Sequence, residues 1–345
     1  MKAKLCVEGA RLLYEYCDEH GIRYQRSGKV IVATAGSELP ALDELERRGR
    51  ANGVPGLRRL DPQELRELEP HCRGVAALHS PNTGIVDFRR IARSLAEELE
   101  SRGASIVPGC PVTGARPADG RLALLTPRGE VRARNALFCA GLWADRLAVA
   151  CGGEADPRIV PFRGAYLRLR PERRELVRSL IYPVPDARLP FLGSHLSRDP
   201  HGEALVGPTA LLAGARDAYR ALRVRPRDLA QTLAWPGTWR MTARFWRTGI
   251  AEIGQAVRSA ALVKSAARFV PELRPGDTLP GPAGVRAQAV ARDGTLLDDF
   301  AFSTTDRALR VRNAPSPAAT SALAIARFVA DEADRLFELR ERRVV

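Results

Sequence analysis

The sequence predicts an α/β protein: an incomplete Rossmann-type nucleotide-binding domain interleaved with an α+β domain built on an antiparallel sheet. A buried strand over 135–140 leads through Gly141 into a helical segment, which is the element order of a nucleotide-binding edge. The block 159–209 reads as longer strands separated by proline-rich turns such as 182–186. The chain then returns to strand, turn, strand and a last helix, so the first domain is discontinuous.

The composition favours a folded protein that handles small molecules. With 345 residues, 45% of them hydrophobic, the chain can bury the cores of two domains. The formal net charge is +14, and four lysines leave 50 of the 54 basic residues as arginine. These arginines are dispersed, often beside acids as in 172–175, and form no basic run with interleaved aromatics. We therefore expect no nucleic-acid partner, and a general attraction for acidic small molecules.

Cysteine spacing and hydropathy exclude other classes. The six cysteines lie far apart without a C-x-x-C pair, so the sequence predicts no metal site and a reduced compartment. No apolar run approaches the roughly 18 residues of a membrane span. Membrane association is therefore expected to be peripheral at most.

The N-terminal third contains several well-marked elements. Apolar residues at helical spacing predict a helix over 4–20 that ends at Gly21, and a strand follows over 28–34. Asp61 precedes Pro62 and stands three residues before Glu64, which is a capping-box start. A chain that begins inside a helix is expected to lack the front of a larger protein, and no G-x-G-x-x-G occurs in it.

The middle of the chain alternates strands and helices. We expect a strand over 75–80, a turn over 81–84 and a helix that Asp87 caps and that ends at Arg102. A strand over 105–107 and two strands around the turn 126–129 follow. From about 209 to 273 the pattern is mostly helical, and the last helix carries an apolar stripe at 322, 325, 329, 333 and 336.

Two C-terminal segments have the features of a ligand site. The segment 281–288 reads as a turn that delivers Arg286 from a strand, and the alternation beside Val285 and Ala287 points Arg286 away from the core. In 313–320, Ser316 reads as an N-cap and Pro317 as the first residue of a helix whose free N–H groups attract an anion. The local alternatives are a surface arginine and a well-capped helix without a ligand.

Three further residues are candidates for chemistry. His195 lies in a strand-like segment that would hold a proton acceptor rigidly, and the alternative is a hydrogen-bonded structural histidine. Arg163 and Tyr166 follow Val160 and Pro161 in another strand and could clamp a substrate. The catalytic set is therefore His195, Arg286, Arg163 and Tyr166.

Seven segments spread over nearly the whole chain have distinctive sequences, at 2–6, 79–87, 139–142, 158–164, 181–186, 281–288 and 313–320. Together they resemble the FAD-dependent L-2-hydroxyglutarate dehydrogenases of the D-amino-acid-oxidase-like superfamily, and their detail is nearer the animal mitochondrial enzymes.

The resemblance implies oxidation of L-2-hydroxyglutarate, a small dicarboxylate, to 2-oxoglutarate, with hydride passing to flavin N5 and electrons to quinone or an electron-transfer chain. It places Arg286 where relatives hold the substrate carboxylate and implies a mitochondrial location. It also implies an FAD site that comprises Gly141, Gly284, Asn313, Pro315, Ser316, Ala318 and Thr320.

The same resemblance divides the chain into two domains. Residues 1–27, 75–155 and 280–345 would form the FAD-binding domain, and 28–74 and 156–279 the substrate domain. The glycine-rich first βαβ unit of the family is not in this sequence, and Thr209 stands where relatives usually have Asn after Gly-Pro. Two alternatives therefore stay open: a shortened non-catalytic isoform unable to bind FAD stably, and another 2-hydroxy-acid or amino-acid oxidase of the superfamily.

Overall fold

The computed structural model describes residues 1–186, 193–257 and 259–339. The helices are α1 (Lys2–Glu19), α2 (Leu39–Ala51), α3 (Pro62–Leu68), α4 (Phe88–Ser101), α5 (Ala144–Ala150), α6 (Pro226–Ala234), α7 (Pro236–Val257), α8 (Ser259–Ala266) and α9 (Ala322–Phe337). The strands are β1 (Tyr24–Gln25), β2 (Lys29–Ala33), β3 (Arg58–Leu60), β4 (Ala76–Ser80), β5 (Ile85–Val86), β6 (Gly114–Ala118), β7 (Arg121–Thr126), β8 (Gly129–Ala133), β9 (Ala136–Phe138), β10 (Arg158–Leu169), β11 (Leu180–Pro183), β12 (His195–Arg198), β13 (Ala204–Gly207), β14 (Leu211–Leu212), β15 (Thr278–Val290), β16 (Ala301–Thr305) and β17 (Ala308–Asn313).

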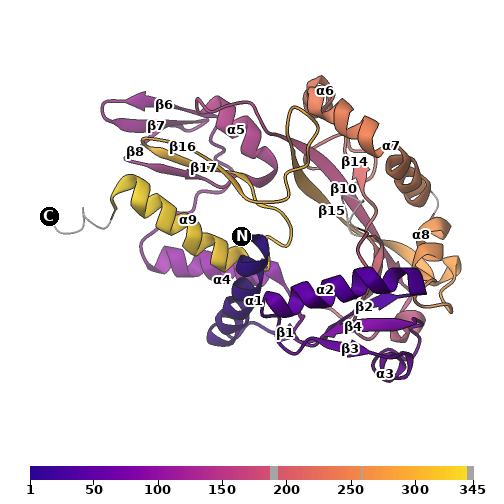
Figure 1. Cartoon of the computed structure of the whole chain (residues 1–345). Helices are drawn as coiled ribbons and strands as arrows, with labels where there is room; N and C mark the ends of the chain where they lie inside the picture. The colour runs from indigo at the N-terminus through magenta and orange to yellow at the C-terminus, as the bar shows by residue number, and fades with distance from the viewer. Residues whose placement is uncertain (187–192, 258, 340–345) are drawn as a thin grey trace.

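The largest sheet crosses the molecule (Figure 1). Its strand order is β14-β10-β13-β12-β11-β2-β4-β3, and β15 pairs antiparallel with β10 from Arg158–Val290 to Leu169–Thr278. Its pairs are antiparallel except that β11 runs parallel to β2. The predicted antiparallel sheet is thus confirmed, and β4 and β15 join it from segments that the sequence assigned to the other domain.

A smaller sheet has the parallel pairing of a nucleotide-binding edge. β17 pairs parallel with β9 and antiparallel with β16. Because parallel strands end at the same edge, Gly141 after β9 and Asn313 at the end of β17 are carried to one side of this sheet. The strand predicted over 135–140 is confirmed, although Leu137 is 49% exposed and one face of β9 is therefore open.

Helices cover these sheets in the way their sequence patterns predict. α8 packs its buried Leu262 and Val263 into the main core of the large sheet. α9 lies against the small sheet, where Val329 and Ala333 pack on Leu309. α1 packs across the start of α9, where Leu5 and Leu12 meet Ala324 (Figure 1). The predicted apolar stripe of the last helix is confirmed at these core positions.

Local capping signals were accurate near the N-terminus. The Asp61 carboxylate accepts hydrogen bonds from Gln63 N (2.7 Å) and Glu64 N (2.9 Å). The Glu64 side chain accepts one from Asp61 N, which completes the capping box. Asp87 accepts from Arg89 N at 2.9 Å and starts α4. Both helices therefore begin at the predicted residues.

Three predictions are wrong. The segment 105–107 is not a strand: its backbone pairs with no strand in the described part of the chain, and Ile106 and Val107 stay 41% and 53% exposed. The segment 281–284 is not a turn: β15 continues through it. Gly281 instead accommodates a bulge of β10, since a Cβ there would lie 2.7 Å from Tyr166 O.

The third error concerns the start of the last helix. α9 begins at Ala322 with Ser321 as its N-cap, not at Ser316. Residues 317–321 form turns closed by Ser321 N to Pro317 O (3.1 Å) and Ala322 N to Ala319 O (3.2 Å). Among the described helices, none is both long and apolar enough to cross a membrane.

Candidate functional site

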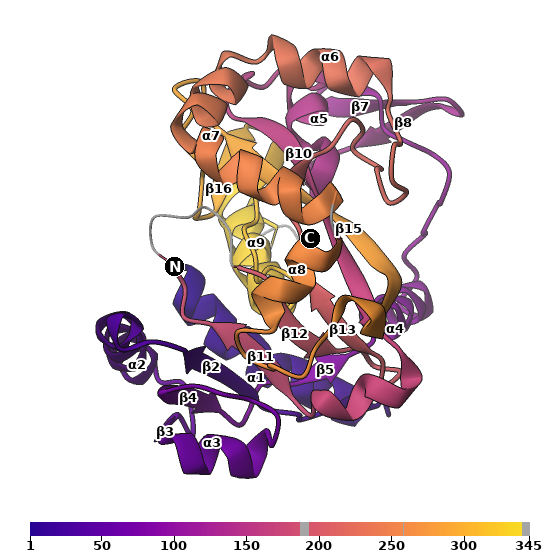
Figure 2. The same ribbon diagram turned by 90° about the vertical axis from the view of Figure 1, so that its right-hand side faces the viewer.

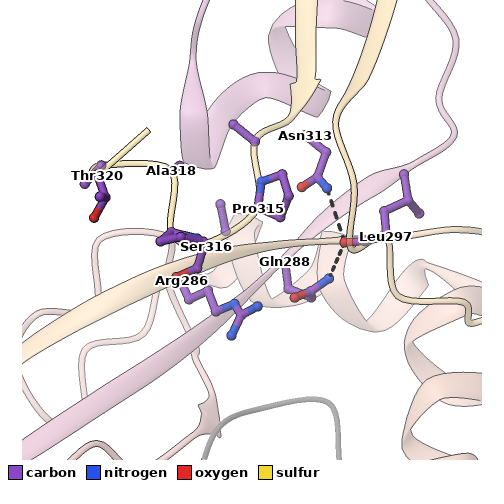
Figure 3. A pocket seen from close by; sticks show the side chains of 12 residues that line it. Arg286, Gln288, Leu297, Asn313, Pro315, Ser316, Ala318 and Thr320 are labelled. Atoms are coloured by element: carbon purple, nitrogen blue, oxygen red, sulfur yellow. Dashed lines mark hydrogen bonds between the residues drawn. The ribbon is translucent and has the colours of Figure 1, made fainter. Parts of the chain in front are cut away.

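A cavity of about 360 Å³ lies between β15 and the segment that joins β17 to α9 (Figure 3). It brings together six of the predicted site residues, from two segments that the sequence analysis had singled out separately. Its lining is Arg286, Ala287, Gln288, Leu297, Asn313, Ala314, Pro315, Ser316, Pro317, Ala318, Ala319 and Thr320.

Gln288 and Asn313 fix the two walls of this cavity to a third segment. Gln288 Nε2 and Asn313 Nδ2 each donate to Leu297 O over 3.2 Å (Figure 3). Asn313 Nδ2 also donates to Asp299 O at 2.8 Å. Both side chains are buried, so these bonds satisfy polar groups that water does not reach. Gln288 was not among the predicted site residues, although its place two residues after Arg286 puts it on the same strand face.

Arg286 supplies the positive charge of the cavity. In the paired strand β10, Phe162 lies opposite Arg286. Val285, the residue before Arg286, packs on the other face of β15 against Ala213 and Ala215. The predicted alternation thus holds for Val285, whereas Ala287 lines the cavity with Arg286. The Arg286 side chain is half-buried, and this burial lowers the pKa of its guanidinium, which still leaves a cation at neutral pH.

The loop 314–320 presents backbone donors and little side-chain bulk. Within the described part of the chain, no hydrogen bond engages the backbone N–H groups of Ala318, Ala319 and Thr320. Consecutive amides of this kind bind an anionic or carbonyl oxygen. The donors belong to the turns before α9 rather than to its first turn, which corrects the source of the predicted anion site.

α1 packs against the end of this loop. A Cβ at Gly9 would lie 2.6 Å from Ser321 Cα and 2.7 Å from Thr320 O, so a larger residue has no room there. Cys6, one turn earlier, hydrogen-bonds Ser321, and burial raises the pKa of its thiol. The loop is thus held between α1 and β15.

His195 lies in a second cluster that does not line the cavity. Its ring stacks on Tyr182 with a centroid separation of 4.0 Å, and Tyr166 approaches edge-on at 6.2 Å. Its Nδ1 lies 3.2 Å from Gly193 O, so Nδ1 carries the proton and Nε2 the lone pair. Desolvation lowers the pKa of His195 to about 4, against a raising contribution from the Gly193 hydrogen bond. Burial likewise lowers the pKa of Lys29, which lies over the Tyr182 ring.

The structure separates the other predicted residues from the cavity. Arg163 pairs with Val285, lies on the face opposite Arg286 and donates from Nε to Ala218 O at 3.1 Å. Gly284 pairs with Gly164 in the middle of β15. Thr209, which stands where relatives usually have Asn, makes two hydrogen bonds to Ala165. Its N donates to Ala165 O (3.0 Å), and its Oγ1 accepts from Ala165 N (3.2 Å).

Gly141 is held in place by a buried ion pair. It starts the 3₁₀ turn η2 (Gly141–Trp143) with a φ of 51°, a conformation that favours glycine. Arg216 donates to Leu142 O and pairs in bidentate fashion with Asp145 at 2.5 and 2.9 Å. Both charged side chains are almost fully buried. Arg216 was not among the predicted site residues, because the pair joins positions far apart in the chain.

Comparison with known proteins assigns the family. The family model for FAD dependent oxidoreductases (DAO) matches residues 1–332. The mitochondrial L-2-hydroxyglutarate dehydrogenases of Nematostella vectensis and Homo sapiens are 44% and 43% identical to the chain, over 98% of it and 78% and 77% of their own lengths. The L-2-hydroxyglutarate dehydrogenase of Indibacter alkaliphilus is 40% identical, over 98% of the chain and 85% of its own length. The chain belongs to this L-2-hydroxyglutarate dehydrogenase family of FAD-dependent oxidoreductases.

Solved structures of the same fold are more distant in sequence. The L-alpha-glycerophosphate oxidase of Mycoplasma pneumoniae superposes with a TM-score of 0.75 at 23% identity, over 97% of this chain and 79% of its own. Glycine oxidase from Geobacillus kaustophilus gives 0.68 at 19% identity, over 96% and 78%. These likenesses establish the fold alone, and this fold agrees with the predicted α/β architecture.

The residues of the cavity fit the cofactor of this family, FAD. Unengaged amides at Ala318–Thr320 offer donors for flavin oxygens, and three alanines leave room for a flat ring. The loop lies at the carboxyl edge of two parallel strands, where α/β sheets bind nucleotides. The donor set therefore suits a flavin ring.

Proposed function

We propose that this protein oxidises L-2-hydroxyglutarate to 2-oxoglutarate with FAD as its cofactor. The relatives that share 40–44% of its sequence carry that activity in their names. The observation that carries the proposal is the position of Arg286 in one cavity with the amides of 318–320. A cation for a carboxylate thus stands directly beside donors for the cofactor.

Arg286 is the proposed carboxylate-binding residue. Its guanidinium can form two parallel hydrogen bonds to a carboxylate, and half-burial strengthens them because less water competes. The proposed FAD-contacting residues are those of 313–320, with Gly141 and Gly284 as further members of the predicted set. When bound, FAD supplies the acceptor for the hydride of the hydroxyl-bearing carbon.

His195 is the proposed proton acceptor for the substrate hydroxyl. Its low pKa keeps the imidazole neutral at neutral pH, and the Gly193 contact leaves Nε2 with the free lone pair. Tyr166 packs edge-on against His195 and is proposed to orient it, together with Tyr182. For Arg163 the contact with Ala218 O supports a positioning role through β10.

The electron acceptor and the location are proposed from the names of the relatives. We propose quinone or an electron-transfer chain as the acceptor, because the relatives are named dehydrogenases rather than oxidases. A mitochondrial location is proposed because the animal relatives are named as mitochondrial.

The test has two stages. An absorbance spectrum of the purified protein after incubation with FAD first measures bound flavin, and a spectrum without bound flavin would favour the non-catalytic alternative. Dye reduction by the flavin-loaded protein is then compared for L-2-hydroxyglutarate, D-2-hydroxyglutarate and L-amino acids. The proposal predicts turnover of the first; turnover of an amino acid instead would contradict it.

A further inference from the structure

Lys29 places an ammonium group inside the large sheet. Of the four lysines, three lie on helices, and Lys29 is the first residue of β2. Its side chain is half-buried, and Nζ lies 5.4 Å from the centre of the Tyr182 ring. Burial lowers the pKa of this group, the Cys6 thiol raises it, and in the described ranges 1–186, 193–257 and 259–339 no ion pair engages it. Burying a cation is costly without a partner anion, so a negatively charged ligand would stabilise it.

Lys29 shares one face of the sheet with the aromatic cluster of His195. Val30 and Ile181 pair with each other and pack into the main core against α8. Figure 2 shows α8 on the near side of these strands. Because side chains alternate along a strand, the neighbouring residues Lys29 and Tyr182 point to the opposite face. His195 stacks on Tyr182 from that face, with a centroid separation of 4.0 Å.

The same face reaches Arg286 through β10. The Tyr166 ring approaches the His195 ring edge-on at 6.2 Å. Phe162 stands four residues before Tyr166 on β10, and an even separation keeps both side chains on one face. Phe162 in turn pairs with Arg286 of β15, and directly paired residues share a face. Across the strands the order is therefore Arg286, His195, Lys29, with one cation on each side of a neutral proton acceptor.

Lys29 is also close to the loop that lines the cavity. Cys6 of α1 hydrogen-bonds Ser321, the residue after Thr320, which lines the cavity. The charge of Lys29 lowers the pKa of the Cys6 thiol, so these two side chains lie near each other. The ammonium group is thus on the side of the sheet where α1 meets the loop 314–320.

We propose that Lys29 binds the second carboxylate of a 2-hydroxy dicarboxylate and selects such substrates over monocarboxylates. The inference rests on the proposed function, in which Arg286 holds one carboxylate and His195 accepts the hydroxyl proton. In 2-hydroxyglutarate the order along the carbon chain is carboxylate, hydroxyl, second carboxylate, which matches the order Arg286, His195, Lys29 across the sheet. A half-buried ammonium group donates strong charge-assisted hydrogen bonds to a carboxylate.

Isothermal titration calorimetry of the flavin-loaded protein tests this role with two ligands of equal length. One is 2-oxoglutarate, and the other is 2-oxopentanoate, which has a methyl group in place of the second carboxylate. We expect the original protein to bind 2-oxoglutarate about 10- to 100-fold more tightly, as for one hydrogen bond between charged groups. Lys29→Met should weaken 2-oxoglutarate by this factor and leave 2-oxopentanoate within about two-fold, so that the preference disappears.

Three further variants separate the role of Lys29 from a structural effect. Lys29→Arg keeps the charge and should retain most of the preference. Arg286→Ala should weaken both ligands, because both carry the first carboxylate. Lys264→Met removes an exposed lysine from α8, on the other face of the sheet, and should bind both ligands like the original protein. Circular dichroism melts verify that each variant is folded.

Two results would overturn the proposal. One is a Lys29→Met variant that keeps its affinity for 2-oxoglutarate or loses affinity for both ligands by the same factor. The other is an original protein without preference between the ligands. A preference for 2-oxoglutarate that depends on Lys29, in a protein that does not oxidise L-2-hydroxyglutarate, would instead contradict the proposed function and support the role of Lys29.

Discussion

The side-chain amides of Gln288 and Asn313 donate to the same acceptor, the backbone carbonyl of Leu297, each over 3.2 Å. A carbonyl oxygen has two lone pairs, so one peptide group joins β15 to the end of β17. The cavity keeps its shape because both walls are tied to this point.

Loss of one amide should loosen the cavity. Asn313→Ala removes two hydrogen bonds, to the carbonyls of Leu297 and Asp299, and we expect a loss of about 1–3 kcal/mol in the free energy of unfolding, since each bond contributes about 0.5–1.5 kcal/mol. Chemical denaturation measures it. Asn52→Ala, which removes a bond to Arg48 O on the exposed end of α2, is the matched control and should change stability much less.

Gly9 should not tolerate a methyl group. The Cβ of Gly9→Ala would lie 2.6 Å from Ser321 Cα, so the loop 314–320 must shift and flavin binding should weaken with the melting temperature. Gly249→Ala in α7 is the control, because a Cβ there meets nothing within 4 Å. There the higher helix propensity of alanine should raise stability by up to about 1 kcal/mol. Equal effects at the two positions would contradict the close packing of α1 on the loop.

Stability should fall in acid because of His195. Its pKa is lowered from 6.5 in the unfolded chain to about 4 in the folded one, so the unfolded state takes up a proton first as the pH drops. The contribution is intact above pH 6.5 and is lost progressively toward pH 4, by about 3 kcal/mol at that pH. Denaturation curves measure the free energy of unfolding between pH 4 and 6.5 for the original protein and for His195→Gln. We expect the variant to lose most of the dependence on pH. The same pH dependence in both proteins would show that another group is responsible.

The Asp145–Arg216 pair should be essential for the turn at Gly141. Asp145→Ala leaves the Arg216 guanidinium buried and without its charge partner, with an expected loss of about 3–5 kcal/mol. Thermal melts compare it with Glu15→Gln, which breaks the exposed Arg11–Glu15 pair and should leave the melting temperature almost unchanged. A similar small effect at Asp145 would refute the anchoring role.

Local rules predicted the elements whose stabilising contacts are local. Asp61 and Asp87 cap their helices within three residues, and sequence spacing shows those contacts directly. Ser316 has the same signal, but the N-cap of α9 is Ser321, five residues later, after turns that pack on Gly9 of a distant helix. The run 105–107 has strand-like composition but no partner to pair with.

The two segments that line the cavity were predicted separately, and the fold brings them together. Alternation beside Val285 correctly pointed Arg286 away from the core, and small residues marked 314–320 as a ligand loop. Sequence spacing could not show that Gln288 and Asn313 share Leu297 O, or that Arg216 reaches Asp145, because these contacts join segments separated by folding. The aromatic surroundings that lower the pKa of His195 are non-local in the same way.

The central claim is that Arg286 holds the carboxylate of L-2-hydroxyglutarate beside the FAD loop. Steady-state dye reduction by flavin-loaded protein tests it most directly, with Arg286→Ala compared against the original protein and the exposed-surface variant Arg128→Ala. We predict a Michaelis constant for L-2-hydroxyglutarate raised about 10- to 100-fold in Arg286→Ala, the equivalent of a lost charged hydrogen bond of about 1.5–3 kcal/mol, and no change in Arg128→Ala. An unchanged Michaelis constant in Arg286→Ala, with flavin still bound, would contradict the account.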